Sequence, residues 1–138
     1  MRILFVNPSM ERYTRQVSFP LGAVSIATYL KANGHTVKII DRTIKTTNIR
    51  KDIEEFAPDI VGVSVISTKA FGDAEKISLT AKKFGAKVVW GGIFASLDPE
   101  FIFKNIDIDF ISIGEGEETW LELVNTLEAG GDPKKIAG

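Results

Sequence analysis

The chain has 138 residues, which suffices for one domain with a buried core. Seventeen Lys and Arg against 18 Asp and Glu give a net charge of -1, so no basic face indicates nucleic acid as a partner. The absence of cysteine excludes disulfides and thiolate-bound zinc or iron–sulfur clusters within these residues. The apolar start at Met1–Val6 is too short for a signal peptide or a membrane span, so we expect a cytoplasmic location and no membrane partner.

Five short apolar runs alternate with segments of helical periodicity, which predicts a parallel sheet covered on both faces. The predicted strands are Arg2–Asn7, Thr36–Asp41, Asp59–Ile66, Lys87–Gly91 and Asp109–Ile113. The predicted helices carry apolar stripes at Leu21, Val24, Ala27 and Leu30; at Ile49, Ile53 and Phe56; at Ala74, Ile77, Ala81 and Phe84; and at Trp120, Leu123, Val124 and Leu127. A short helix is expected to begin at Pro99, and Asn33-Gly34 and Gly130-Gly131 are typical of helix C-caps. This order predicts an α/β fold: a Rossmann-like or flavodoxin-like three-layer sandwich with a five-stranded parallel sheet in the order 2-1-3-4-5.

Two stretches depart from this regularity. Residues Pro8 to Phe19 form a first loop longer than the usual connection of about 2–6 residues. Its apolar Met10, Tyr13, Val17 and Phe19 lack helical or strand spacing, which suggests that a ligand or a neighbouring domain covers them. Residues 129–135 resemble a linker, so we expect a single domain over residues 1–138 that forms the N-terminal part of a longer protein.

The strand ends indicate a wide ligand at the carboxyl edge of the sheet. Ser64, Gly91-Gly92 and Gly114–Glu117 all lie at or just after such ends, where open α/β sheets bind ligands. No G-x-G-x-x-G follows the first strand, so Asp41 is interpreted as a polar strand terminus and not as a ribose-binding acid. Glu117 and Glu118 favour the positive end of a helix, whereas Glu115 stays a candidate acceptor for ligand amides.

The residues show no catalytic constellation. His35 is the only histidine; it precedes the second strand at the amino edge, where a surface or capping role is expected. The hydroxyl residues after the third strand have no histidine or cysteine partner, so no catalytic and no metal-binding residue is predicted. Trp90 is interpreted as a core residue because it continues a buried strand.

Five motifs occur in order along nearly the whole chain. They are Phe19-Pro20-Leu21-Gly22-Ala23; Gly34-His35-Thr36-Val37 with Asp41; Pro58-Asp59-Ile60-Val61-Gly62-Val63-Ser64; Gly91-Gly92-Ile93-Phe94-Ala95-Ser96; and Asp109-Phe110 through Gly114-Glu115-Gly116-Glu117. They resemble "P-P-L-G-L", "G-H-x-V-x-x-x-D", "P-D-x-V-G-x-S", "G-G-x-H-A-T" and "D-x-V-x-x-G-E-G-E" of the cobalamin-binding domain of radical SAM enzymes. Ser64-Val65-Ile66 and Gly91-Gly92 are also similar to the "S-x-L" and "G-G" motifs of the broader cobalamin-binding fold.

The resemblance implies a corrinoid held across the carboxyl edge, with its nucleotide tail between the first and third strands. It implies cofactor contacts from Asn7, Leu21, Gly22, Ser64, Ile66, Ser67, Thr68, Gly91, Gly92, Phe94, Ala95, Gly114, Glu115, Gly116 and Glu117. The "D-x-H-x-x-G" motif that supplies an axial histidine is absent after the first strand, so any cobalamin is expected base-off with no histidine on cobalt. Phe94 also departs from the family pattern, which often has histidine there.

The iron–sulfur cluster and S-adenosylmethionine are expected only in a C-terminal radical SAM domain outside these residues, because the chain has no cysteine. The resemblance implies that this fragment binds the cofactor without turnover, and that the parent protein is a methyltransferase or cyclase. An alternative is a corrinoid-free flavodoxin-like domain that uses the apolar first loop to dock the catalytic domain.

Overall fold

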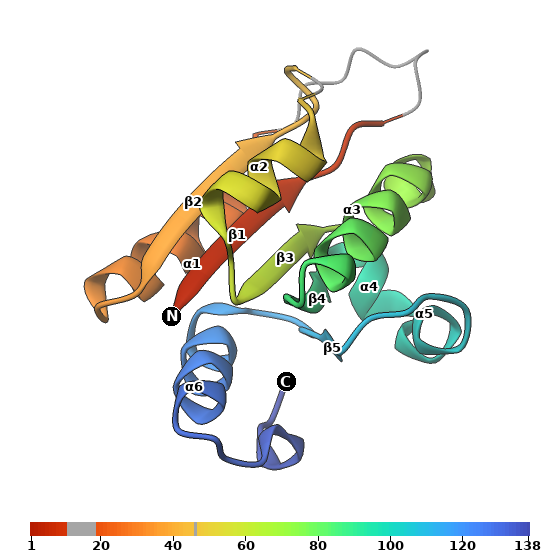
Figure 1. Cartoon of the computed structure of the whole chain (residues 1–138). Helices are drawn as coiled ribbons and strands as arrows, with labels where there is room; N and C mark the ends of the chain where they lie inside the picture. Colours follow the sequence, from red (N-terminus) through yellow and green to blue (C-terminus); the bar gives the residue numbers. More distant parts are fainter. Residues whose placement is uncertain (11–18, 46) are drawn as a thin grey trace.

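A five-stranded parallel sheet forms the centre of the protein in the computed structural model, which describes residues 1–10, 19–45 and 47–138 (Figure 1). The strands pair in the order β2-β1-β3-β4-β5, which confirms the predicted topology. Their bounds are β1 (Arg2–Asn7), β2 (Thr36–Asp41), β3 (Ile60–Ser64), β4 (Lys87–Gly91) and β5 (Phe110–Ile111). The helices are α1 (Leu21–Ala32), α2 (Ile49–Phe56), α3 (Phe71–Lys83), α4 (Ile93–Leu97), α5 (Pro99–Asn105) and α6 (Glu117–Glu128), with 3-10 turns η1 (Thr68–Ala70) and η2 (Pro133–Lys135).

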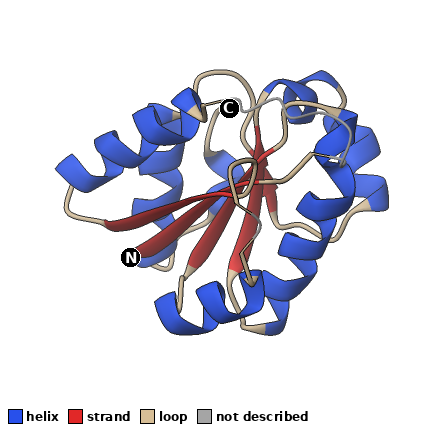
Figure 2. Ribbon diagram, turned by 90° about the horizontal axis from the view of Figure 1, so that it is seen from above, coloured by secondary structure: helices blue, strands red, loops and turns tan. Residues whose placement is uncertain are grey.

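Helices cover both faces of the sheet, and Figure 2 shows the strands between two helical layers. Helices α1 and α6 pack on one face, over Ile3, Phe5 and Ile60. Helices α2, α3, α4 and α5 pack on the other face, over Leu4, Val6 and Val61. Because successive side chains of a strand point to opposite faces, the nearly continuous apolar runs of β1 and β3 supply both cores.

Helix ends follow the predicted glycine signals. Gly34 has φ +88°, and the His35 amide donates to the Leu30 carbonyl at 3.1 Å. Gly130 has φ +68°, and the Gly131 amide donates to the Thr126 carbonyl at 2.8 Å. Both glycines adopt the left-handed conformation that ends a helix without a Cβ penalty. The predicted C-caps of α1 and α6 are therefore confirmed.

Two strands are shorter than predicted. Strand β3 ends at Ser64 because the next carbonyl, that of Val65, accepts from the Phe94 amide at the start of α4 and not from a strand. Strand β5 has two residues because the side chain of Asp109, at 2.9 Å, takes the Val88 amide that a longer ladder would use. Each strand end is thus set by a hydrogen bond from outside the ladder.

The helical stripes also differ from the prediction. The buried face of α1 consists of Ala23, Ala27 and Leu30, whereas Leu21 is 72% exposed. Phe84, predicted to continue the α3 stripe, lies at the helix C-cap and is 41% exposed. Helix α4 was not predicted, because its five residues are too short to show a period. Helix α5 begins at Pro99 as predicted, with Asp98 as its cap.

His35 lies at the amino edge, as predicted, but it is buried and not on the surface. Its Nδ1 lies 3.3 Å from the amino group of Met1, and its Nε2 lies 3.2 Å from Asn125 Oδ1. The imidazole therefore links the start of β1 to α6 in a structural role. No helix in the described ranges is long and apolar enough to span a membrane.

Candidate functional site

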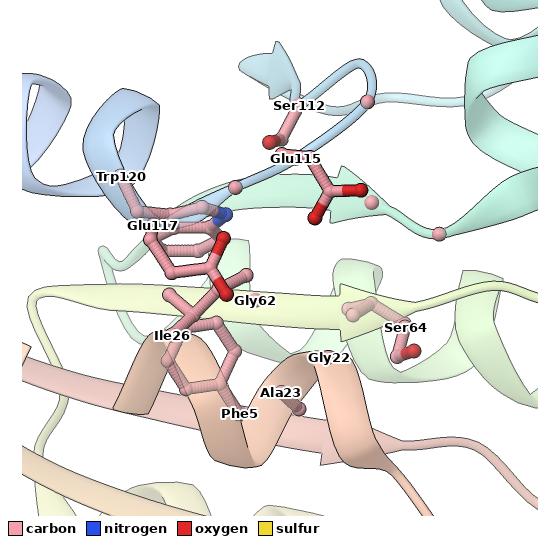
Figure 3. A pocket seen from close by; sticks show the side chains of 15 residues that line it. Phe5, Gly22, Ala23, Ile26, Gly62, Ser64, Ser112, Glu115, Glu117 and Trp120 are labelled. Carbon is pink, nitrogen blue, oxygen red and sulfur yellow. The ribbon is translucent and has the colours of Figure 1, made fainter. Parts of the chain in front are cut away.

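A pocket of about 590 Å³, open to solvent, lies at the carboxyl edge between α1 and α6 (Figure 3). The lining residues come from β1, α1, β3, β4 and the segment from β5 into α6: Phe5, Gly22, Ala23, Ile26, Gly62, Val63, Ser64, Gly91, Gly92, Ser112, Gly114, Glu115, Gly116, Glu117 and Trp120. The site is mainly apolar and glycine-rich.

The floor of the pocket is an aromatic pair over a glycine. The rings of Phe5 and Trp120 lie 4.6 Å apart between centroids, at an interplanar angle of 58°. A Cβ on Gly62 would lie 2.6 Å from Phe5 Cδ1 and 2.7 Å from Trp120 Cη2. Only glycine at this point of β3 leaves room for both rings, so the floor depends on the absence of a side chain.

Two further glycines hold the walls close together. Gly92 has φ +96°, and a Cβ there would lie 2.8 Å from the Val65 carbonyl oxygen. A Cβ on Gly116 would lie 2.5 Å from Cδ1 of Ile26 on α1. A larger residue at Gly92 would meet the backbone of Val65 and disturb the fold itself, whereas a larger residue at Gly116 would first displace the end of the Ile26 side chain.

Two serine hydroxyls are available near the carboxyl end of β3. The side chain of Ser64 lines the pocket, and the Ser64 hydroxyl has no hydrogen-bond partner among the described residues. Ser67 Oγ is buried and also lacks a partner in the described part of the chain. A buried hydroxyl without a partner is costly, so a polar ligand group at this edge would stabilise it.

Carboxylates stand at the rim on the α6 side. Glu115 is exposed at the mouth of the pocket (Figure 3). Glu117 accepts a hydrogen bond from the Ser25 hydroxyl, which links α6 to α1 across the pocket and lowers the pKa of Glu117 below its ordinary value. The rim is therefore acidic and rich in acceptors, which suits ligand amide or hydroxyl groups and not a free phosphate.

An ion pair fixes the far side of the carboxyl edge. Arg42, after β2, donates to both carboxylate oxygens of Asp73 on α3, each at 2.8 Å, and to the Thr47 carbonyl at 2.6 Å. Asp73 also accepts from the Ser9 amide at 2.8 Å, so it holds the start of the first loop. Burial would raise the pKa of Asp73, but these hydrogen bonds and the Arg42 charge outweigh it and keep that pKa below 3.8.

The structure brings eight of the predicted site residues together around the pocket: Gly22, Ser64, Gly91, Gly92, Gly114, Glu115, Gly116 and Glu117. The sequence placed them on different strands and loops, and their convergence follows from the parallel order of those strands.

Seven predicted site residues do not line this pocket: Asn7, Leu21, Ile66, Ser67, Thr68, Phe94 and Ala95. Asn7 is buried at the end of β1, where its amide donates to Asp41 Oδ1 at 3.0 Å. Asp41 therefore acts as a polar strand terminus, as predicted. Ala95 is the fully buried residue of α4, and the Phe94 ring packs edge-on 6.1 Å from Phe71. Leu21 and the three residues after β3 lie at the carboxyl edge but outside the pocket wall.

Sequence reasoning missed seven lining residues: Phe5, Ala23, Ile26, Gly62, Val63, Ser112 and Trp120. Strand alternation could have found Gly62, which shares a face with Ser64 two residues on. Helical spacing could have found Trp120, four residues after Gly116.

Trp90, by contrast, is fully buried as predicted, and its Nε1 donates to Ser78 Oγ at 2.8 Å. Of the first-loop residues, Tyr13 and Val17 lie outside the described ranges, and Phe19 is 64% exposed.

Comparison with known proteins identifies relatives of this chain. The family model for the B12 binding domain matches residues 13–124. An uncharacterised methyltransferase of Pyrococcus horikoshii is 36% identical over all of this chain, which covers 32% of that protein. The anaerobic magnesium-protoporphyrin IX monomethyl ester cyclase of Rubrivivax gelatinosus is 31% identical over 94% of this chain, which covers 25% of the cyclase.

A solved structure gives the same result in three dimensions. The radical S-adenosylmethionine methyltransferase TsrM from Kitasatospora setae, with cobalamin and a [4Fe-4S] cluster bound, superposes with a TM-score of 0.84 at 26% identity. The match covers 99% of this chain and 28% of TsrM. The chain thus spans only about a quarter to a third of the length of these relatives.

Proposed function

Because the chain belongs to the B12-binding domain family, we propose that it is the cobalamin-binding module of a radical SAM enzyme. The observation that carries the proposal is the glycine-lined pocket between α1 and α6, at the carboxyl edge where this fold binds ligands. The pocket is smaller than a whole corrinoid. It would therefore take the nucleotide tail, and the corrin ring would be held at the exposed carboxyl edge.

The residues present fit such a ligand. The Phe5–Trp120 floor offers an apolar surface to the planar base of the tail, and Gly91 adds no side chain to the slot. The free Ser64 hydroxyl supplies a hydrogen-bonding group beside them. Glu115 at the mouth can accept from amide side chains of the corrin. These groups bind and orient; bound cobalamin supplies the cobalt that carries a methyl group or assists radical chemistry.

The proposed cofactor state is base-off, with no histidine on cobalt. His35 is the only histidine in the sequence, and its two ring nitrogens face Met1 and Asn125 at the amino edge. The pocket lies at the opposite edge of the sheet, so this imidazole is out of reach of a ligand there. This chain would therefore supply no histidine ligand to a cobalamin held in that pocket.

The radical SAM chemistry would belong to a C-terminal domain with its iron–sulfur cluster and S-adenosylmethionine, since this chain has no cysteine. TsrM, which carries cobalamin and a [4Fe-4S] cluster, supports that arrangement. The reaction of the parent would be a methyl transfer or a cyclisation, as the names of the relatives suggest. The corrinoid-free docking domain is less well supported, because it names no ligand for the pocket between α1 and α6.

The test is an anaerobic titration of the purified chain with cob(II)alamin, followed by visible absorption and EPR. We expect saturable binding and a cob(II)alamin signal without nitrogen superhyperfine coupling. A signal with nitrogen coupling would contradict the base-off state. Failure to bind, in both the isolated chain and the full-length protein, would contradict cobalamin binding and support the docking domain.

A further inference from the structure

A second groove, lined by cationic residues, lies on the opposite side of the sheet between α2 and α3. Its open volume is about 1,150 Å³, and it is lined by Arg42, Thr47, Asn48, Ile49, Arg50, Lys76, Thr80, Lys83 and Phe84. The lining includes four cations and no carboxylate. It shares no residue with the pocket between α1 and α6, so nothing proposed for cobalamin accounts for it.

Three of these cations have no counter-ion. The charge of Arg42 is matched by Asp73, but Arg50, Lys76 and Lys83 form no ion pair with any described residue. Two other lysines of the same helices are paired: Lys51 lies 3.6 Å from Glu55, and Lys82 lies 2.7 Å from Asp107. Unpaired cations such as Lys31 and Lys104 also lie elsewhere in the described residues, but the groove brings three of them together between two neighbouring helices, in a chain whose net charge is -1.

The two lysines of the groove lie on the same side of α3. Lys76, Thr80 and Lys83 are four and three residues apart, so they form one stripe on the helix surface. Arg50 on α2 faces that stripe, and its guanidinium lies 5.9 Å from the centre of the Phe84 ring. That ring is 41% exposed at the end of α3 and adds an apolar surface to the cationic groove.

We propose that this groove binds a phosphorylated small molecule of nucleotide size. Arg50, Lys76 and Lys83 would contact the phosphate oxygens. The Thr80 hydroxyl already donates to the Lys76 carbonyl at 2.7 Å, so the cations would supply the donors. Phe84 would contact the attached ring. The groove lies in the range of volume that such ligands need once its open part is discounted. This inference does not rest on cobalamin binding, because the two sites occupy opposite faces of the sheet.

The experiment is calorimetric titration of the chain with ATP and, separately, with tripolyphosphate at low salt. We expect saturable binding of both that weakens as salt screens the cations. The variant Arg50→Gln/Lys76→Gln/Lys83→Gln should raise both dissociation constants at least about tenfold, from the loss of three charge contacts. The matched control is Lys31→Gln/Lys104→Gln/Lys134→Gln, which removes three exposed cations outside the groove.

The control should bind both probes like the wild type, and both triple variants should retain the cobalamin titration. An equal loss in the control would overturn the proposal, since it would reflect net charge alone. Absence of binding by either probe at millimolar concentration would also overturn it. Phe84→Leu should weaken ATP but not tripolyphosphate; an equal effect on both would contradict the assignment of a nucleotide.

Discussion

Phe5 on β1 and Trp120 on α6 meet at 4.6 Å between ring centroids directly over Gly62 of β3. This contact joins the sheet to α6 and at the same time forms the floor of the proposed tail slot. The core and the binding site therefore share side chains, so a substitution here affects both stability and ligand affinity.

Gly62→Ala should destabilise the fold. The new Cβ would lie 2.6 Å from Phe5 and 2.7 Å from Trp120, and overpacking of this kind costs about 1–3 kcal/mol. The free energy of unfolding in urea measures the effect. Gly72→Ala is the matched control, because a Cβ there meets nothing within 4 Å. A loss at Gly62 no larger than that at Gly72 would show that the two rings can move apart.

Gly22→Leu should block cobalamin without unfolding the protein. Gly22 is the second residue of α1 and lines the pocket, and its Cβ would meet nothing within 4 Å. A leucine side chain can therefore enter the slot without a clash in the free protein. We expect the cob(II)alamin dissociation constant to rise more than about tenfold, which corresponds to about 1.4 kcal/mol. The titration that tests the proposed function measures it.

Gly72→Leu provides the comparison for this variant. Gly72 is the second residue of α3 and lies outside the pocket, so the two substitutions are alike in helix position and in side chain. Its affinity should equal that of the wild type. Wild-type affinity in a folded Gly22→Leu protein would place the tail elsewhere.

Asp73→Asn should be strongly destabilising. The Arg42 side chain is only 2% exposed, and the amide cannot replace the charge that faces it. Removing one partner of a buried pair costs about 3–5 kcal/mol. The exposed pair of Lys51 and Glu55 supplies the control, since Glu55→Gln should change stability by less than about 1 kcal/mol. Equal, small effects from both variants would mean that solvent reaches Arg42.

The same pair predicts how stability depends on pH. The pKa of Asp73 is lower in the folded chain than its ordinary value of 3.8, so the folded state binds this proton less readily than the unfolded state. Its contribution is therefore fully present above pH 3.8 and is lost as the pH falls through the folded pKa. Unfolding measured from pH 6 to pH 3 should show the gap between wild type and Asp73→Asn narrowing below pH 3.8. A constant gap would contradict the lowered pKa.

The topology was predictable because it depends on patterns within short segments. The apolar runs of β1 and β3 are buried on both faces, and the glycines after α1 and α6 adopt the left-handed conformation that ends a helix. The order of motifs from Gly22 to Glu117 also indicated the family, since it survives in the sequence without any knowledge of distances.

The set of residues that line the pocket could not be predicted from patterns within short segments. Phe94 and Ala95 follow Gly92 by two and three residues in sequence, but α4 turns them towards the core, away from the slot. Trp120 and Phe5 lie 115 positions apart, and no local pattern indicates that they touch. The buried face of α1 keeps the predicted Ala27 and Leu30 but begins at Ala23, so Ala23 and Ile26 line the wall while Leu21 is exposed.

The sequence by itself thus determined the fold, the family and the edge at which a ligand binds, because each depends on periodicity and on glycine conformation along the chain. Only the tertiary structure decided which side chains meet there, because Gly62, Gly92 and Gly116 control close approach between segments far apart in sequence. The pairing of Arg42 with Asp73 and the unpaired charges of Arg50, Lys76 and Lys83 were likewise decided by packing, since a charge finds its partner in space and not along the chain.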